Sequence, residues 1–151
     1  MTDFWYPHIT VATIVEKDNL FLLVEEQANG SRVYNQPAGH LEKNESLMDA
    51  AIRETLEETG WHVALESLCG FYLYTAAKNQ TTYLRCCFIA RPLEDTGAAL
   101  DDGIIAAHWM SYQQIQEASP VLRSPMVLQC IEDYLGGKRL PLDSIYHSPK
   151  A

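Results

Sequence analysis

The pattern of apolar and polar residues near the N-terminus is typical of β-strands joined by tight turns. His8–Val15 and Leu20–Glu25 are rich in β-branched and other apolar residues. The polar residues Glu16-Lys17-Asp18-Asn19 separate the two runs, so a β-hairpin is predicted. A second turn is expected at Asn29-Gly30-Ser31, and a loop at Gln36-Pro37-Ala38-Gly39 leaves a short extended piece.

Helical periodicity begins at about Ser46 and ends at Gly60, which supplies a C-terminal stop, and Asn44 is the expected N-cap. Three strand-like runs and two helical segments follow: Leu68–Thr75, Thr82–Ala90, Ile104–Met110, Tyr112–Ala118 and Pro125–Leu135. Strands mixed with a few helices favour an α/β or α+β sandwich over an all-β barrel. With no repeat, linker or low-complexity segment, residues 1–151 are predicted to form a single domain.

Composition and charge exclude several classes of protein. The 151 residues include 11 Lys and Arg and 20 Asp and Glu, a net charge of −9, and no basic stripe suits nucleic acid. The apolar run near Ile9–Val15 is too short to span a membrane, and the N-terminus lacks the pattern of a signal peptide. The four cysteines form no CxxC pair, which indicates reduced, buried thiols and a cytoplasmic location.

The segment RETLEETG places three acids on one face of the predicted helix. Glu54, Glu57 and Glu58 stand at i, i+3 and i+4, a spacing at which like charges cost an isolated helix ~0.2–0.5 kcal/mol per pair. Leu47 and Ala51 fall on the same side of the helix, so this face is expected to point into the protein. A solvated surface helix would carry its acids on the opposite side.

Three carboxylates that point into a protein need a cation. Arg53 neutralises only part of their charge, since it projects from the flank of the face beside Glu57. Hard oxygen ligands suit Mg²⁺ or Mn²⁺, ions that keep several waters and bind substrate phosphates. Gly39 lets the backbone approach, so that its carbonyl would add a ligand. The acidic face therefore predicts a divalent-metal site that receives a phosphate compound.

The segment from 39 to 61 resembles the Nudix box, G-x5-E-x7-R-E-U-x-E-E-x-G-U, in which U is a bulky apolar residue. All seven fixed positions agree: Gly39, Glu45, Arg53, Glu54, Glu57, Glu58 and Gly60. Thr55 and Trp61 depart from the pattern, at apolar positions that carry no carboxylate. The chain is therefore similar to the Nudix hydrolase family.

Further segments resemble NudJ-type phosphatases of that family: Asn35–Glu42, Tyr83-Leu84-Arg85, Leu122–Pro125 and Pro141-Leu142. The resemblance implies an α/β/α sandwich around a mixed sheet. It also implies Mg²⁺-dependent hydrolysis of nucleoside tri- and diphosphates, and of thiamine-type pyrophosphates. The expected partner is thus a small phosphate compound, with no nucleic acid and no membrane, and the oligomeric state is left open.

The resemblance assigns roles to the residues of the box. Glu54, Glu57 and Glu58, with the Gly39 carbonyl, would hold the metal, and Glu54 and Glu57 would act in catalysis. Glu54 is the candidate general base, although the sequence does not decide which glutamate takes the proton. Arg53 would orient Glu57 or another acid, and Glu45 would support the first turn of the helix.

Four residues outside the carboxylate set are weaker candidates. Arg85 and Arg123 would bind phosphate, because guanidinium pairs with it bidentately, although a solvated role suits Arg123 too. His40 would contact phosphate or face water. Asp102, in the loop before a strand, would supply an extra acid or simply form a turn.

Two other functions remain open at this stage. A non-catalytic binding module on the same fold would be favoured by loss of a box glutamate, and none is lost. An enzyme acting on a dinucleotide or a nucleotide sugar would keep the same box and differ in its loops, around 76–81 and 93–103. The shared fold alone does not choose between substrates.

Overall fold

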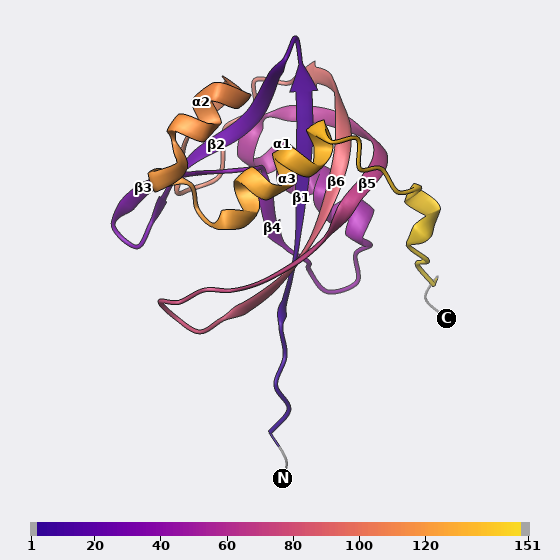
Figure 1. Ribbon diagram of the computed structural model, residues 1–151. Helices are drawn as coiled ribbons and strands as arrows, with labels where there is room; N and C mark the ends of the chain where they lie inside the picture. The colour runs from indigo at the N-terminus through magenta and orange to yellow at the C-terminus, as the bar shows by residue number, and fades with distance from the viewer. Residues whose placement is uncertain (1–2, 149–151) are drawn as a thin grey trace.

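Seven strands and five helical segments make up the computed structural model, which describes residues 3–148 (Figure 1). The strands are β1 His8–Lys17, β2 Leu20–Ala28, β3 Ser31–Asn35, β4 Ala38–His40, β5 Trp61–Thr75, β6 Thr82–Asp95 and β7 Ile104–Ser111. The α-helices are α1 Leu47–Thr59, α2 Tyr112–Glu117 and α3 Pro125–Leu135, and the 3₁₀ turns are η1 Ser119–Val121 and η2 Leu142–Ser144. No helix within the described residues is long and apolar enough to cross a membrane.

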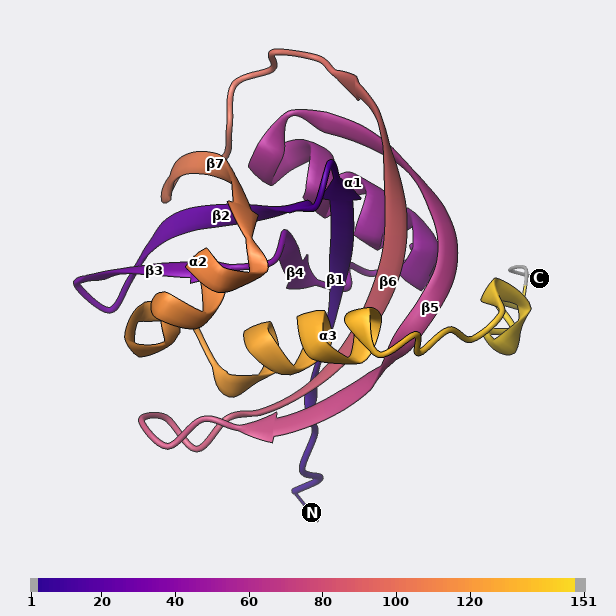
Figure 2. The ribbon, with the colours of Figure 1, turned by 45° about the horizontal axis from the view of Figure 1, so that its top comes forward.

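The strands form one mixed sheet in the order β3-β2-β1-β6-β5, with β4 paired to β1 and β7 paired to β2. β1 runs parallel to β6, and every other pair is antiparallel. β1 and β2 pair only next to their turn, at Glu16↔Phe21 and Lys17↔Leu20. Further from the turn the two strands separate, so the sheet divides into two halves. Helices lie on both faces, α1 on one and α3 on the other (Figure 2). The predicted mixed sheet with helices is confirmed.

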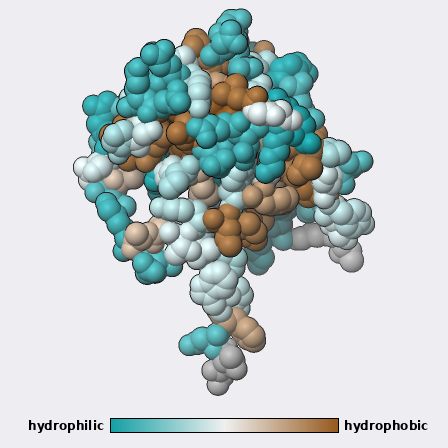
Figure 3. Space-filling model, in the orientation of Figure 1, coloured by the Kyte–Doolittle hydropathy of each residue, from teal (hydrophilic) through white to brown (hydrophobic). Residues whose placement is uncertain are grey.

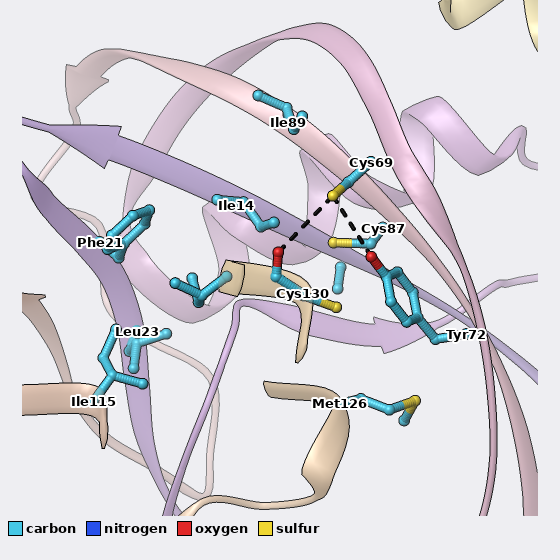
Figure 4. Packing of buried hydrophobic residues seen from close by; sticks show 12 residues of the cluster. Ile14, Phe21, Leu23, Cys69, Tyr72, Cys87, Ile89, Ile115, Met126 and Cys130 are labelled. Carbon is cyan, nitrogen blue, oxygen red and sulfur yellow. Dashed lines mark hydrogen bonds between the residues drawn. The ribbon is translucent and has the colours of Figure 1, made fainter. Parts of the chain in front are cut away.

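Alternation along β6 sends its two cysteines to opposite faces of the sheet. Cys87 joins the cluster beneath α2 and α3, together with Cys69 and Cys130 (Figure 4). Cys86 joins the cluster beneath α1, where burial raises the pKa of its thiol to about 12. All four cysteines are free and buried, as expected.

Left-handed turn residues close both N-terminal hairpins. Asp18 and Asn19 have φ of 52° and 63°, and Asn29 and Gly30 have φ of 51° and 79°. Positive φ at both central residues matches the twist of paired strands, and Asn, Asp and Gly adopt it most easily. The predicted hairpin and the second turn are confirmed.

Two expected boundaries differ. β5 begins at Trp61, seven residues before the apolar run, because its first half pairs with the extension of β6 to Asp95 and exposes polar side chains such as Glu66. Ala38 and Gly39 lie within β4 instead of a loop, because they pair with β1.

Ser46, not Asn44, is the N-cap of α1. The Ser46 hydroxyl accepts a hydrogen bond from the Asp49 N–H at 3.0 Å, whereas Asn44 sits in the preceding turn with φ of 70°. Both residue types cap helices well, so the loop geometry decided between them. At the other end Gly60, with φ of 78°, donates its N–H to the Leu56 carbonyl, as expected for a C-terminal glycine.

Thr55 and Trp61, the two residues that depart from the Nudix box, both pack well in the structure. Thr55 is fully buried, and its hydroxyl donates to the Ala51 carbonyl at 2.7 Å and lies 2.8 Å from the Thr13 hydroxyl. A buried hydroxyl that has hydrogen-bond partners avoids the free-energy cost of a buried hydroxyl without them. Trp61 packs edge-to-face on Trp109 at the end of the sheet.

Candidate active site

Glu54 of α1 lies directly against the backbone of β4. Its carboxyl carbon stands 2.1 Å from the position that a Cβ on Gly39 would occupy. Strand β4 is fixed there because Gly39 pairs with Val11 of β1. The glycine at the start of the box is therefore required by the close approach of a carboxylate.

Glu58, one turn further along α1, is the most buried of the three box glutamates. Its side chain accepts a hydrogen bond from the Ala38 N–H at 2.8 Å. Burial raises the pKa of Glu58 to about 8, opposed by that hydrogen bond and reinforced by the negative charges of Glu26, Glu54 and Asp101. Glu58 therefore holds its proton well above the range of an ordinary glutamate.

Arg53 ties the acids of the helix together. Its guanidinium donates to Glu54 at 2.7 Å, to Glu57 at 3.1 Å, and to both oxygens of Glu45 at 2.7 and 3.0 Å. It also donates to the His40 carbonyl at 3.2 Å. Hydrogen bonding to Arg53 lowers the pKa of Glu45. Glu45 precedes the N-cap, so it acts by holding Arg53 and not in the first helical turn, which corrects the expected helix-dipole role.

The carboxylate oxygens are ligands that suit a divalent cation, although these side chains do not converge on one point in the structure. Within residues 3–148 no three His, Cys, Asp or Glu side chains are gathered closely enough to hold a metal ion. Arg53 engages Glu54 and Glu57, and Ala38 engages Glu58. Burial and neighbouring acids raise the pKa of both Glu54 and Glu58, and a cation would relieve that repulsion.

A cavity of about 820 Å³ opens beside Glu54 and Glu58. Segments of β2, β3, β4, the β5–β6 hairpin, η1 and α3 form its walls. Its charged and aromatic lining consists of Glu26, Glu42, Glu54, Glu58, Arg32, Lys78, Arg85, Arg123, His40, Tyr74 and Tyr83. The volume suits a small-molecule ligand, and cations and acids occupy the same cavity.

Arg85 forms part of the cavity wall, where it is only 4% exposed. Its two terminal nitrogens donate to Gln36 at 2.7 Å and to Asn35 at 2.9 Å. Its Nε is buried and has no hydrogen-bond partner among the described residues. The amides thus hold the guanidinium in place, and the predicted contact with phosphate stays a prediction.

Arg123 and His40 also line the cavity. Arg123 donates to the Glu26 carboxylate at 2.7 Å, and its backbone N–H donates to the Tyr34 carbonyl. His40 lies 3.2 Å from the ring nitrogen of His8. Burial, together with the charges of His8 and Arg123, lowers the pKa of His40, which favours a neutral ring. Their predicted contacts with phosphate also remain predictions.

Asp101 and Glu26 are the acids that sequence reasoning missed. The Asp101 N–H donates to the Glu57 carbonyl at 3.0 Å, and the charge of Asp101 adds to the effect of burial, which raises the pKa of Glu54. The sequence had pointed to its neighbour Asp102, for which an acid role stays a prediction. One local feature of the sequence pointed to Glu26. Glu25 and Glu26 follow the apolar run of β2, and alternation along a strand must send one of them to each face of the sheet.

Known proteins support one family for this fold and site. The family model described as NUDIX domain matches residues 6–128. The chain belongs to the Nudix family. It is a Nudix hydrolase, an enzyme that hydrolyses pyrophosphate bonds. The extent of the domain over all of 1–151 stays a prediction.

Individual relatives agree. Phosphatase NudJ of Escherichia coli strain K12 is 41% identical over 141 residues, which cover 92% of this chain and 90% of the relative. A NUDIX hydrolase structure from Nitrosomonas europaea is 46% identical, with a TM-score of 0.92 over 95% of this chain and 98% of that one. The NUDIX domain of Shewanella oneidensis NrtR, complexed with ADP ribose, shares only the fold: 15% identity and a TM-score of 0.71 over 89% of this chain and 90% of that one.

Proposed function

We propose that the protein is a phosphohydrolase, dependent on Mg²⁺ or Mn²⁺, of nucleoside tri- and diphosphates and of thiamine-type pyrophosphates. The observation that carries this proposal is the position of two carboxylates, the partly buried Glu54 and the buried Glu58, in the wall of a cavity that also holds Arg85 and Arg123. Similarity to Phosphatase NudJ over most of both chains supports a phosphatase activity. The cytoplasmic location inferred from the sequence remains an expectation.

Glu54, Glu57 and Glu58 would hold the metal, with the Gly39 carbonyl beside them. A divalent cation bound there neutralises the diphosphate and lowers the pKa of water. Glu54 is the preferred general base by its resemblance to the family, and burial, which raises its pKa, helps it to take a proton near neutral pH. Arg53 fixes one oxygen of Glu54 by a hydrogen bond of 2.7 Å, which leaves the other oxygen to accept the proton.

Arg85, Arg123 and His40, which also line the cavity, would bind the phosphates. Arg123 must then exchange its partner Glu26 for the substrate, which the half-exposed position of its side chain allows. Tyr74 lines the same cavity, where its ring is available to stack on a base or a pyrimidine ring.

A dinucleotide or nucleotide sugar is the second candidate substrate. The size of the cavity favours it, because about 820 Å³ is near the upper end of the usual range for small-molecule sites. A non-catalytic module is less favoured, since every box carboxylate is present and Glu54 and Glu58 both face the cavity.

The deciding experiment measures released phosphate and pyrophosphate from a panel of substrates. The panel includes nucleoside tri- and diphosphates, thiamine pyrophosphate, a dinucleotide and a nucleotide sugar, each with Mg²⁺, Mn²⁺ or excess EDTA. We expect turnover of the first two classes only with metal, and loss of turnover in Glu54→Gln. Undiminished turnover in EDTA would rule out the mechanism, and exclusive turnover of the last two substrates would favour the second candidate.

A further inference from the structure

The segment before β1 extends away from the body of the protein and carries three consecutive aromatic residues (Figure 1). Phe4, Trp5 and Tyr6 are 71%, 71% and 72% exposed. In the space-filling view this segment, residues 3–7, stands clear of the rest of the molecule (Figure 3). We call it the aromatic arm. Three neighbouring aromatic side chains in water form the kind of apolar surface that marks an interaction site.

A strip of apolar side chains lies uncovered on the sheet next to the arm. Ile9 pairs with Leu84 on β6, and Leu84 pairs with Leu73 on β5, so the three side chains share one face. Phe71, two residues before Leu73 on β5, points to the same side. Ile9, Phe71 and Leu73 are 42%, 51% and 71% exposed. We call Ile9, Phe71, Leu73 and Leu84 together the apolar strip.

The apolar strip continues the core face that α1 covers further along the sheet. Phe71 pairs with Cys86, and Cys86 pairs with Val11, and the last two are buried in the cluster beneath α1. The helix covers this part of the face and leaves the row of Ile9 and Leu73 exposed. The strip therefore continues a core surface, and no element within residues 3–148 covers it.

We propose that a second copy of this chain covers the strip, in a two-fold dimer in which the arm of each copy lies across the strip of the other. The arm and the strip are contiguous, since only Pro7 and His8 separate Tyr6 from Ile9. The same surface of each copy then contributes an arm to the partner and accepts the partner's arm, as a two-fold interface requires. The arm runs away from its own sheet, which places it to reach a partner (Figures 1 and 2).

The available area is sufficient for a stable dimer. Six exposed apolar residues in each copy, three on the arm and three on the strip, would bury about 1,400 Å² over both copies, within the range of specific interfaces. The interface also leaves the cavity open. Thr10 and Arg85, which line the cavity, alternate with Ile9 and Leu84 and so project from the other face of the sheet.

Sedimentation over a wide range of protein concentration tests the dimer. We expect the wild type to dimerise, and two variants to be monomers: a triple arm variant, Phe4→Ser with Trp5→Ser and Tyr6→Ser, and the strip variant Leu73→Lys. Leu93→Lys, which changes a leucine that is 54% exposed near the other end of β6, is the matched control and should dimerise normally. Each variant should melt cooperatively and keep the hydrolytic activity of the wild type, since none of the substituted residues lines the cavity.

Mixing the two monomeric variants gives the sharper test. In a mixed dimer the intact arm of Leu73→Lys meets the intact strip of the arm variant, so one of two contacts is restored. We expect the mixture to associate more strongly than either variant alone and more weakly than the wild type. A wild type that stays monomeric, a dimer that survives both variants, or a mixture that gains nothing would each overturn the proposal. A monomeric wild type that binds phosphatidylcholine vesicles would overturn it in favour of a lipid surface.

Discussion

The carboxyl group of Glu54 fills the space that a side chain on Gly39 would need, with 2.1 Å between its carbon and the missing Cβ. The contact joins a helix to a strand. Because β4 is held by its pairing with β1, only the glutamate has room to move. The position of the proposed base therefore depends on the absence of one methyl group.

Gly39→Ala should remove most of the activity and little of the stability. The new Cβ would push aside the flexible end of Glu54, and misplacing a general base costs roughly 10²-fold or more in kcat. Steady-state kinetics and a thermal melt together measure the two effects.

Gly70→Ala is the matched control for that substitution. A Cβ on Gly70 would meet the flexible end of Lys138 at 3.1 Å, so this variant also displaces a charged side chain. Neither residue lines the cavity, and kcat should stay at the wild-type value. Equal losses in Gly39→Ala and Gly70→Ala would show that the effect is general crowding.

Arg53→Lys should lower kcat by about 10²-fold, since catalysis tolerates little displacement of a positioned group. An ammonium group cannot reproduce the fork that reaches Glu45, Glu54 and Glu57 together. Arg91→Lys, which changes an exposed arginine 3.7 Å from Glu66, should have no effect. Wild-type kcat in Arg53→Lys would mean that the network does not position the base.

The part of the site on α1 could be predicted because it depends on local periodicity. Spacing alone put Glu54, Glu57 and Glu58 on the inward face of the helix. The structure has Glu54 and Glu58 facing the cavity, whereas the Glu57 side chain is 38% exposed and does not line it. Glu26 and Asp101 were missed because their approach to Glu58 depends on how β2 and a distant loop pack, which no local pattern records. The N-cap was wrong for a related reason: the turn around Asn44 decides which polar residue meets the helix.

Arg85→Lys should lower both stability and kcat/KM. Lysine has a single donor nitrogen in place of the two separate nitrogens that reach Gln36 and Asn35, and a buried acceptor left unpaired costs about 1–3 kcal/mol. For a domain of this size, each kcal/mol lowers the melting temperature by roughly 2–4 °C. A lower melting temperature with unchanged KM and kcat would show that Arg85 supports the wall and does not bind phosphate. Asn35→Asp, which keeps an acceptor for Arg85, should retain more stability than Arg85→Lys.

The raised pKa of Glu58 gives the metal-free protein a definite dependence on pH. Its pKa is about 8 in the folded state, against an ordinary value of 4.5 that we expect in the unfolded state. The folded state therefore binds more protons between these two values, so the free energy of unfolding falls as pH rises through that window. The stabilisation is fully present below about 4.5 and is lost as pH passes about 8.

Glu58→Gln should remove this pH dependence, because glutamine keeps the shape and never ionises. In EDTA the variant should melt at or above the wild type near pH 8, while Glu66→Gln, at an exposed position, should follow the wild type throughout. Mg²⁺ at 100 times its Kd should stabilise the wild type by about 2.7 kcal/mol, and Glu58→Gln should lose most of that response together with its activity. Thermal melts across this pH range, with and without Mg²⁺, measure the stability effects, and a hydrolysis assay measures the activity. If Glu58→Gln responds to pH and to Mg²⁺ as the wild type does, Glu58 neither holds a proton nor binds the metal, and the proposed site is wrong.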